Sequence, residues 1–304
     1  MKWLKYRWGD KPVDDLFQYY SDNYFLIDYS NIRTDVGAPF EETQNLIKHI
    51  ANTCPPPYNL FVSGGIDSQA MLYAWQQSKI PFRAYSFVYN KNYNEHDITT
   101  LRSFSKKHNI KIHYVDIDVF NFLEKDLITY SRRYVCNSPQ ITLYMRFSEI
   151  INNGTKIYSG DQSGDLDYTI LGLYRFALKN NADIIPFFFH HTESIAGSFS
   201  NAINHAMKDD FFHYVKGKTY QAKAYIYNLQ GFDVIPTKKF SGFEGYKKYY
   251  DDYAHLVSPK MRLRAGNFAS KRIFDLLFRY PLFEINNYND HTGKINHPFS
   301  ETFL

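Results

Sequence analysis

The stretch Phe61-Val62-Ser63-Gly64-Gly65-Ile66-Asp67-Ser68 decides the fold of this chain, because an apolar run passes through two glycines into a helix-like run. Paired glycines let the backbone turn with positive φ and bring N–H groups close to an anion, and the following helix adds the positive end of its dipole. Ser63 and Ser68 can donate hydroxyl hydrogen bonds, and Asp67 can hold Mg²⁺ against phosphate oxygens. The stretch therefore predicts a phosphate-binding loop between a strand and a helix.

This loop is not a Walker A loop, because no lysine follows its glycines. The string Ser-Gly-Gly-Ile-Asp-Ser resembles the PP-loop of the ATP pyrophosphatase superfamily (adenine nucleotide alpha hydrolase-like). That superfamily includes asparagine synthetase, GMP synthetase, argininosuccinate synthetase and several tRNA- and deazaguanine-modifying enzymes. The resemblance implies an ATP site at which the nucleotide is split between its α and β phosphates and AMP passes to an oxygen of the substrate. The alternative interpretation is a Ser/Gly-rich turn with a capping aspartate.

Apolar periodicity around the loop alternates between helix and strand. It predicts helices over residues 39–54, 69–77, 98–108, 119–130 and 140–152, and strands over 59–62, 82–88, 111–117 and 156–158. This alternation is typical of a parallel α/β sheet, and the resemblance makes it a twisted, Rossmann-like PP-loop sheet with helices on both faces. Ligands of such sheets lie beyond the carboxyl ends of the strands, so residues 63–68, 86–90 and 159–165 should converge on one crevice.

The alternation fades toward the end of the chain, which suggests three parts. Residues 1–40 form an N-terminal preface, 41–178 the ATP-binding core, and 179–304 a mostly helical segment on the substrate side. In the last part we expect a strand over 184–189, a helix over 192–207 and a basic helix over 251–279, whereas 220–235 is rich in tyrosine and less regular.

A second motif follows the strand predicted at 156–158, in the run Ile157-Tyr158-Ser159-Gly160-Asp161-Gln162-Ser163-Gly164-Asp165. It resembles the second signature of the asparagine synthetase group, Leu-Ser-Gly-x-Gly-x-Asp-Glu. The resemblance implies that Ser159 and Gly160 line the AMP pocket, that Asp161 is an acidic residue close to the reacting centre, and that Asp165 shares Mg²⁺ with Asp67.

This second motif departs from the family pattern in two ways. It carries one extra residue before Asp165, and Leu166 replaces the final glutamate, with Asp167 one step further on. The sequence therefore leaves the second metal ligand open between Asp165 and Asp167, and it leaves the substrate open.

The resemblance also supplies the rest of the candidate site. Synthetase-like members use a C-terminal lysine to stabilise the adenylylation transition state and hold pyrophosphate, for which Lys260, Lys271 and Arg272 are candidates; a solvated helix face is the alternative. The predicted catalytic residues are Asp67, Asp161, Lys260 and Lys271. The predicted nucleotide-binding residues are Phe61, Ser63, Gly64, Gly65, Asp67, Ser68, Phe87, Ser159 and Gly160. Glu95 and Asp97 are expected near the site without a catalytic role, and His190-His191 as a structural pair.

Composition narrows the possible partners of the chain. A net charge of +4 over 304 residues suits ATP or another anion and does not indicate nucleic acid. Two separated cysteines, Cys54 and Cys136, argue against a disulfide framework and a zinc ribbon. No apolar run approaches membrane-spanning length, which favours a cytoplasmic setting. Lys2 stands where an N-terminal-nucleophile glutaminase would need cysteine, so no such domain is expected.

The combined motifs resemble the synthetase domain of asparagine synthetase from about residue 40 to 178. We expect an AMP-forming ligase that adenylylates a substrate carboxylate or carbonyl oxygen for attack by an amine, giving an amide. The nitrogen would come from ammonia, a separate amidotransferase subunit or the substrate itself. Two alternatives remain: a deazaguanine- or lysidine-type nucleobase or tRNA modification enzyme, and a nucleotide-binding protein without turnover.

Overall fold

Five parallel strands form the main sheet of the computed structural model. The structure describes residues 5–8, 11–12, 25–28, 35–126, 129–130, 143–159, 184–187, 194–195, 198–199, 201–202, 219–237 and 294–296. The strands lie in the order β6-β5-β4-β7-β8, and every neighbouring pair is parallel. Their bounds are β4 (Tyr58–Phe61), β5 (Phe82–Tyr89), β6 (Ile112–Ile117), β7 (Thr155–Tyr158) and β8 (Ile184–Pro186). The predicted parallel α/β fold class is confirmed.

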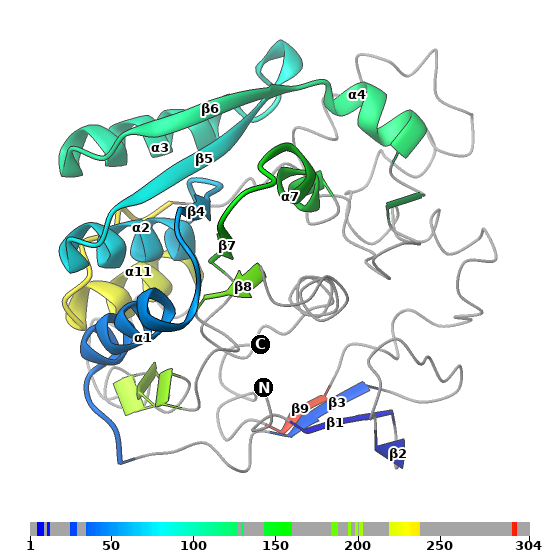
Figure 1. Cartoon of the computed structure of the whole chain (residues 1–304). Helices are drawn as coiled ribbons and strands as arrows, with labels where there is room; N and C mark the ends of the chain where they lie inside the picture. Colours follow the sequence, from blue (N-terminus) through cyan, green and yellow to red (C-terminus); the bar gives the residue numbers. More distant parts are fainter. Residues whose placement is uncertain are drawn as a thin grey trace.

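Helices cover both faces of this sheet (Figure 1). On one face α2 (Ile66–Ser78) contacts α1 (Pro39–Thr53), α3 (Glu95–His108) and α11 (Thr219–Leu229). On the other face lies α7 (Phe147–Ile150), where the Phe147 ring stacks on the rings of Phe61 and Phe87. The predicted two-sided arrangement is therefore present.

Strand β4 is buried along its whole length, as expected for the middle of a parallel sheet. Successive side chains of a strand point to opposite faces. Leu60 joins the apolar core that includes Ile47, Trp75 and Ala224 from the helices of one face. The next residue, Phe61, packs on the opposite face. Both layers are thus anchored at the strand that leads into the glycine loop.

Two of the predicted helices are not continuous α-helices among the described residues. The helix predicted over 119–130 begins as α4 (Val119–Asn121), capped by the Asp118 carboxylate on the Asn121 N–H at 3.0 Å. It then continues as a π-helical turn, Phe122–Asp126. Asp126 pairs with Arg146 at 2.8 Å, so a tertiary contact joins this turn to the segment before α7. The helix predicted over 140–152 is represented among the described residues by helical residues 143–145 and by α7.

The prediction was wrong for residues 220–235, because α11 occupies most of this segment. Its C-terminus is a Schellman motif: Gly231 has φ +88°, its N–H donates to the Asn228 carbonyl at 3.2 Å, and the Phe232 N–H donates to the Tyr227 carbonyl at 3.2 Å. The rings of Tyr227 and Phe232 meet edge to face at 5.1 Å, which is the apolar contact that accompanies this motif. The sequence did carry a signal for this helix: a run free of glycine and proline, followed by Gly231-Phe232 at its C-terminal end.

A second, four-stranded sheet joins distant parts of the chain. Its order is β2 (Lys11–Pro12), β1 (Lys5–Trp8), β3 (Phe25–Asp28) and β9 (Lys294–Asn296), with β9 parallel to β3 and the other pairs antiparallel. The division of the chain at residues 40 and 178 stays a prediction, and this sheet combines strands from its first and third parts. Residues 251–279 lie outside the described residues. Within the described part, no helix is both long and apolar enough to cross a membrane.

Candidate active site

The glycine loop connects the end of β4 to the start of α2. Gly64 has φ +80°, and a β-carbon at this position would overlap the carbonyl oxygen of Asp97 at the start of α3. Gly65 is the N-cap of α2 in an extended conformation, and no side chain caps the helix. The first N–H groups of a helix have no partner within it. The loop therefore presents the N-terminus of a 13-residue helix to whatever lies beyond β4.

Three serine hydroxyls gather at this loop. The Ser63 N–H donates to Ser68 Oγ at 3.1 Å, and the two hydroxyl oxygens lie 3.2 Å apart. Ser159, which follows β7, places its Oγ 3.4 Å from that of Ser68. The ends of β4 and β7 thus meet, as the alternation predicts for parallel strands. In this arrangement the hydroxyls bond to one another and hold the turn closed.

The Asp67 carboxylate is held by two side chains of α11. Tyr227 donates its hydroxyl hydrogen bond to Oδ1 at 2.8 Å, and the Lys223 ammonium lies 2.8 Å from Oδ2. Lys223 and Tyr227 are four residues apart, so they share one face of their helix. Asp67 also stands in the first turn of α2, where the helix dipole stabilises a negative charge. The sequence predicted Asp67 at the site but missed both of its partners.

Gln69 links the back of the loop to the segment after α11. Its fully buried side chain donates through Nε2 to the Gly64 carbonyl at 2.9 Å and to Thr237 Oγ1 at 3.1 Å. Its Oε1 accepts from the Ile235 N–H at 2.8 Å. The carbonyl of the positive-φ glycine is therefore fixed by an amide that also anchors residues 235–237. Sequence reasoning missed this role as well.

A buried tyrosine lies on the other side of the loop. Burial, together with the nearby Tyr89 and Asp97, raises the pKa of Tyr144 well above its ordinary value, and the Ser63 hydroxyl opposes the rise. The carbonyl of Tyr144 accepts a hydrogen bond from the Tyr158 hydroxyl at 2.8 Å. Burial thus disfavours the ionised form of Tyr144, whose hydroxyl lies beside that of Ser63.

The remaining predicted site residues fall into three groups. Phe61 and Phe87 are buried in the aromatic layer against α7, so any contact with a nucleotide would come through their backbone. Asp97 is buried beside Gly64, whereas the exposed Glu95 pairs with Arg102 on its own helix. The following lie outside the described residues: Gly160, Asp161, Asp165, Asp167, His190, His191, Lys260, Lys271 and Arg272.

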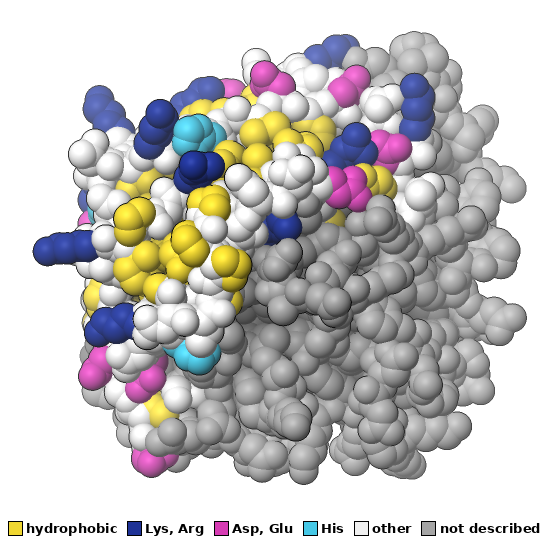
Figure 2. Space-filling model, in the orientation of Figure 1, with side chains coloured by type: hydrophobic (Ala, Val, Ile, Leu, Met, Phe, Trp, Pro, Cys, Tyr) yellow, Lys and Arg dark blue, Asp and Glu magenta, His cyan; other side chains and the backbone are white. Residues whose placement is uncertain are grey.

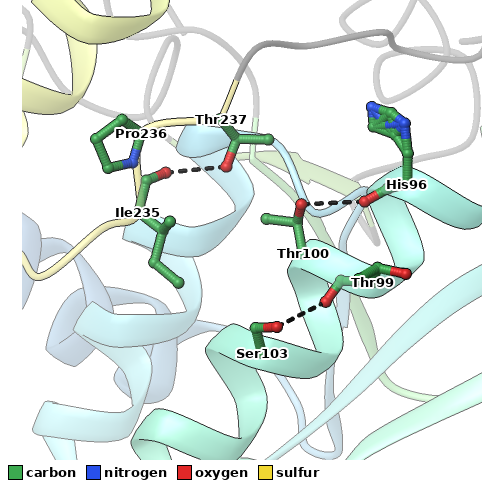
Figure 3. Close-up of a pocket in the computed structure, with 7 residues that line it drawn as sticks. All are labelled: His96, Thr99, Thr100, Ser103, Ile235, Pro236 and Thr237. Carbon is green, nitrogen blue, oxygen red and sulfur yellow. Dashed lines mark hydrogen bonds between the residues drawn. The ribbon is translucent and has the colours of Figure 1, made fainter.

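An open groove of about 480 Å³ lies between α3 and the segment that Gln69 anchors (Figure 3). Its lining consists of His96, Thr99, Thr100, Ser103, Ile235, Pro236 and Thr237. The hydroxyls of Thr100, Ser103 and Thr237 each donate to a nearby backbone carbonyl at 3.0 Å. These three hydroxyls therefore use their protons within the protein, and a ligand in the groove would find them as hydrogen-bond acceptors.

Charges of both signs are mixed on one face of the described part. On the face drawn in Figure 2, Lys and Arg side chains are spread across the coloured part and interspersed with Asp and Glu. Nor does the described part of the chain bring three His, Cys, Asp or Glu side chains together as a metal site. Among the described residues at this loop, Asp67 is a carboxylate that could contact a cation.

The comparisons with known proteins found similarity to one family model and to several solved structures. Residues 59–142 match the model of queuosine biosynthesis protein QueC. NMN synthetase from Francisella tularensis is 14% identical over 67% of this chain and 100% of its own, with a TM-score of 0.32. NH3-dependent NAD synthetase from Campylobacter jejuni is 14% identical over 81% and 96%, with a TM-score of 0.34. The U34-tRNA thiolase NcsA from Methanococcus maripaludis is 13% identical over 88% and 86%, with a TM-score of 0.35. No curated protein matches the chain.

The matched family segment begins in β4, contains the whole glycine loop and continues past β6. It thus covers the strand, the positive-φ turn at Gly64 and the helix N-terminus with Asp67 in its first turn. QueC is itself a PP-loop family. Over residues 59–142, which contain the loop motif and three elements of the parallel sheet and its helices, the chain is thus similar to a family of the PP-loop ATP pyrophosphatase superfamily.

Proposed function

We propose that the chain is an ATP-dependent, AMP-forming ligase that adenylylates a substrate oxygen for attack by an amine. The observation that carries this proposal is the N-terminus of α2, which no side chain caps, behind the positive-φ turn at Gly64, with a carboxylate in its first turn. Backbone N–H groups in this arrangement favour an anion such as pyrophosphate. PP-loop enzymes use ATP, typically with Mg²⁺.

In the proposed reaction each loop residue has one role. The N–H groups at Gly64 and Gly65 and the hydroxyls of Ser63 and Ser68 bind the β- and γ-phosphates. These hydroxyls exchange their present mutual hydrogen bonds for bonds to phosphate oxygens. Fixed hydrogen-bond donors directed at developing charge are usually the largest contribution to catalysis. In phosphoryl transfer, positioning and electrostatic stabilisation account for most of the rate enhancement.

The residues at the loop also suit a magnesium ion. Mg²⁺ in nucleotide sites is held by one or two carboxylates together with phosphate oxygens, rather than by a cage of protein ligands. Asp67 supplies one such carboxylate, and Asp165 or Asp167 is the proposed second. When bound, the ion would neutralise phosphate charge. Asp161, Lys260 and Lys271 stay proposed catalytic residues, and Ser159 with Gly160 would line the AMP side.

The substrate class has two candidates. Amide formation on a small carboxylate rests on the resemblance of the two motifs to the asparagine synthetase group. A deazaguanine-type modification is favoured by the QueC match over residues 59–142. QueC-like synthases usually carry a zinc-binding cysteine cluster, and this sequence contains only two cysteines. We therefore keep the amide-forming ligase as the first candidate.

Pyrophosphate release measured with ATP and Mg²⁺ tests this proposal. The substrates are a panel of amino acids with ammonium, a carboxylated deazaguanine, and total tRNA. We expect stimulation by one substrate class in the wild type and its loss in Asp67→Asn. Asp116→Asn, an exposed aspartate on β6, is the matched control and should keep full activity. ATP binding without release for any substrate would instead support a nucleotide-binding protein without turnover.

A further inference from the structure

Both oxygens of the Asp67 carboxylate face donors from α11. The Tyr227 hydroxyl and the Lys223 ammonium each lie at 2.8 Å, one on each oxygen. The ammonium, 2.8 Å from Oδ2, therefore lies on the side of this oxygen that a metal ion bound to Asp67 would need.

The two donors differ in their freedom to move. Tyr227 is fully buried, and its ring packs edge to face against Phe199 at 5.4 Å and Phe232 at 5.1 Å. Lys223 ends in a flexible four-carbon stem, and its side chain is 19 % exposed. Tyr227 can thus keep Asp67 in one rotamer while the ammonium leaves Oδ2.

Charge balance decides when the ammonium leaves. A divalent cation arriving alone would meet an ammonium already paired with the carboxylate, and the two cations repel. A nucleotide arriving with the cation brings several negative phosphate oxygens, which can accept both positive charges. Without any cation, Asp67 would in turn repel the phosphates that α2 attracts.

We propose that Lys223 occupies the cation position on Asp67 in the nucleotide-free protein, so that a divalent metal binds Asp67 only together with the nucleotide. This inference rests on the proposed function, in which Asp67 holds the metal against phosphate. Lys223 is a positioning residue in this role, because it acts through Asp67. Metal and nucleotide therefore enter as one complex, and free metal is excluded.

Binding of Mn²⁺, measured by electron paramagnetic resonance without substrate turnover, tests the inference. In the wild type we expect Mn²⁺ to bind together with α,β-methylene ATP, and to bind at least about tenfold more weakly alone. Lys223→Gln should tighten binding of Mn²⁺ alone by about tenfold, because the competing ammonium is gone. Lys223→Arg keeps the charge and should retain the wild-type pattern.

Two controls separate this result from a general effect of charge. Asp67→Asn should lose Mn²⁺ binding both with and without the analogue. Lys107→Gln removes a lysine from an exposed ion pair with Asp233 and should behave like the wild type. Melting temperatures of all variants establish that they are folded.

Three outcomes would overturn the inference. Tight binding of Mn²⁺ alone to the wild type, lost in Asp67→Asn, refutes it even if Lys223→Gln fails to fold. Unchanged or weaker binding of Mn²⁺ alone to folded Lys223→Gln also refutes it, while leaving the proposed function intact. Failure of the wild type to bind Mn²⁺ even with the analogue would overturn both the proposed function and the inference.

Discussion

The backbone of Gly64 lies directly against the backbone of Asp97, so that a β-carbon on Gly64 would overlap the Asp97 carbonyl oxygen. Gly64 also has φ +80°, which L side chains rarely adopt. We expect Gly64→Ala to lose roughly 2–4 kcal/mol of stability, because strain of a positive φ and displacement of α3 add together. Urea denaturation and binding of an ATP analogue measure the two consequences, and analogue binding should be abolished.

Gly231 provides a matched control for this substitution. It has φ +88°, but a β-carbon there would meet only the Phe40 side chain at 3.7 Å, an ordinary contact. Gly231→Ala should therefore cost only the backbone strain, about 1–2 kcal/mol, and should keep nucleotide binding. Equal losses of stability in Gly64→Ala and Gly231→Ala would show that the close approach of Gly64 to Asp97 does not contribute to the effect.

Acidification should destabilise the protein through His108. Burial lowers the pKa of this histidine, with Asp233 opposing and Lys107 assisting the shift, and its ring packs on Phe104 and Tyr73. The unfolded chain then binds the proton more readily than the fold, so stability is fully present above the unfolded pKa of about 6.5 and is lost as pH falls through the folded value. His108→Gln should lose less stability than the wild type between pH 7.5 and 5.

The measurement is the free energy of unfolding from urea denaturation at a series of pH values. Above pH 7.5 His108 is neutral in both the folded and the unfolded state. The free energies of unfolding of the wild type and of His108→Gln should therefore differ by a constant amount in that range. Parallel curves down to pH 5 would contradict a role for this histidine in acid destabilisation.

Local sequence patterns predicted the elements that carry the loop. Paired glycines permit a tight turn, and Pro39 with Glu41 and Glu42 behind it is a typical helix start. The strands β4, β5 and β7 are short runs rich in aromatic and aliphatic residues, and all three lie within one residue of the predicted ends. These signals act over a few residues, so no tertiary information is needed to interpret them.

The partners of Asp67 could not be predicted in this way. Tyr227 lies 160 residues further along the chain, and no local pattern couples the two positions. The helix α11 buries Ala224, Ile226 and Tyr227 against other elements. Contacts with those elements determine which of its residues are buried, so the buried residues do not form a single apolar stripe at helical spacing. The role of Gln69 could not be predicted either. Nothing in the sequence distinguishes a buried glutamine with three hydrogen-bond partners from an exposed one.

Replacing Gln69 should weaken both the fold and the loop. Gln69→Leu keeps the approximate volume but leaves the Gly64 carbonyl, the Ile235 N–H and the Thr237 hydroxyl without the Gln69 amide. Burying polar groups without partners costs about 1–3 kcal/mol each, so we expect a loss of roughly 2–4 kcal/mol and weaker nucleotide binding. Gln77→Leu, at an exposed position of the same helix, should change neither by a measurable amount. Thermal unfolding with equal losses in both variants would refute the linking role of Gln69.

Removing the hydroxyl of Tyr227 isolates its bond to Asp67 from the packing of its ring. Tyr227→Phe keeps the contacts with Phe199 and Phe232 and deletes only the hydrogen bond to Oδ1. A hydrogen bond to a charged acceptor contributes about 1.5–3 kcal/mol, so urea denaturation should show a loss toward the lower end of that range, because Asp67 is partly exposed to water.

The same variant should also bind the ATP analogue more weakly, since Asp67 is then no longer held in one rotamer. Tyr85→Phe is the matched control: this half-buried tyrosine packs against Phe61 on the opposite face of the sheet. It should leave both stability and binding within experimental error. If Tyr227→Phe matched Tyr85→Phe in stability and in analogue binding, the Tyr227 hydroxyl would have no role in either. Lys223 and the helix dipole would then suffice to hold the Asp67 carboxylate in place.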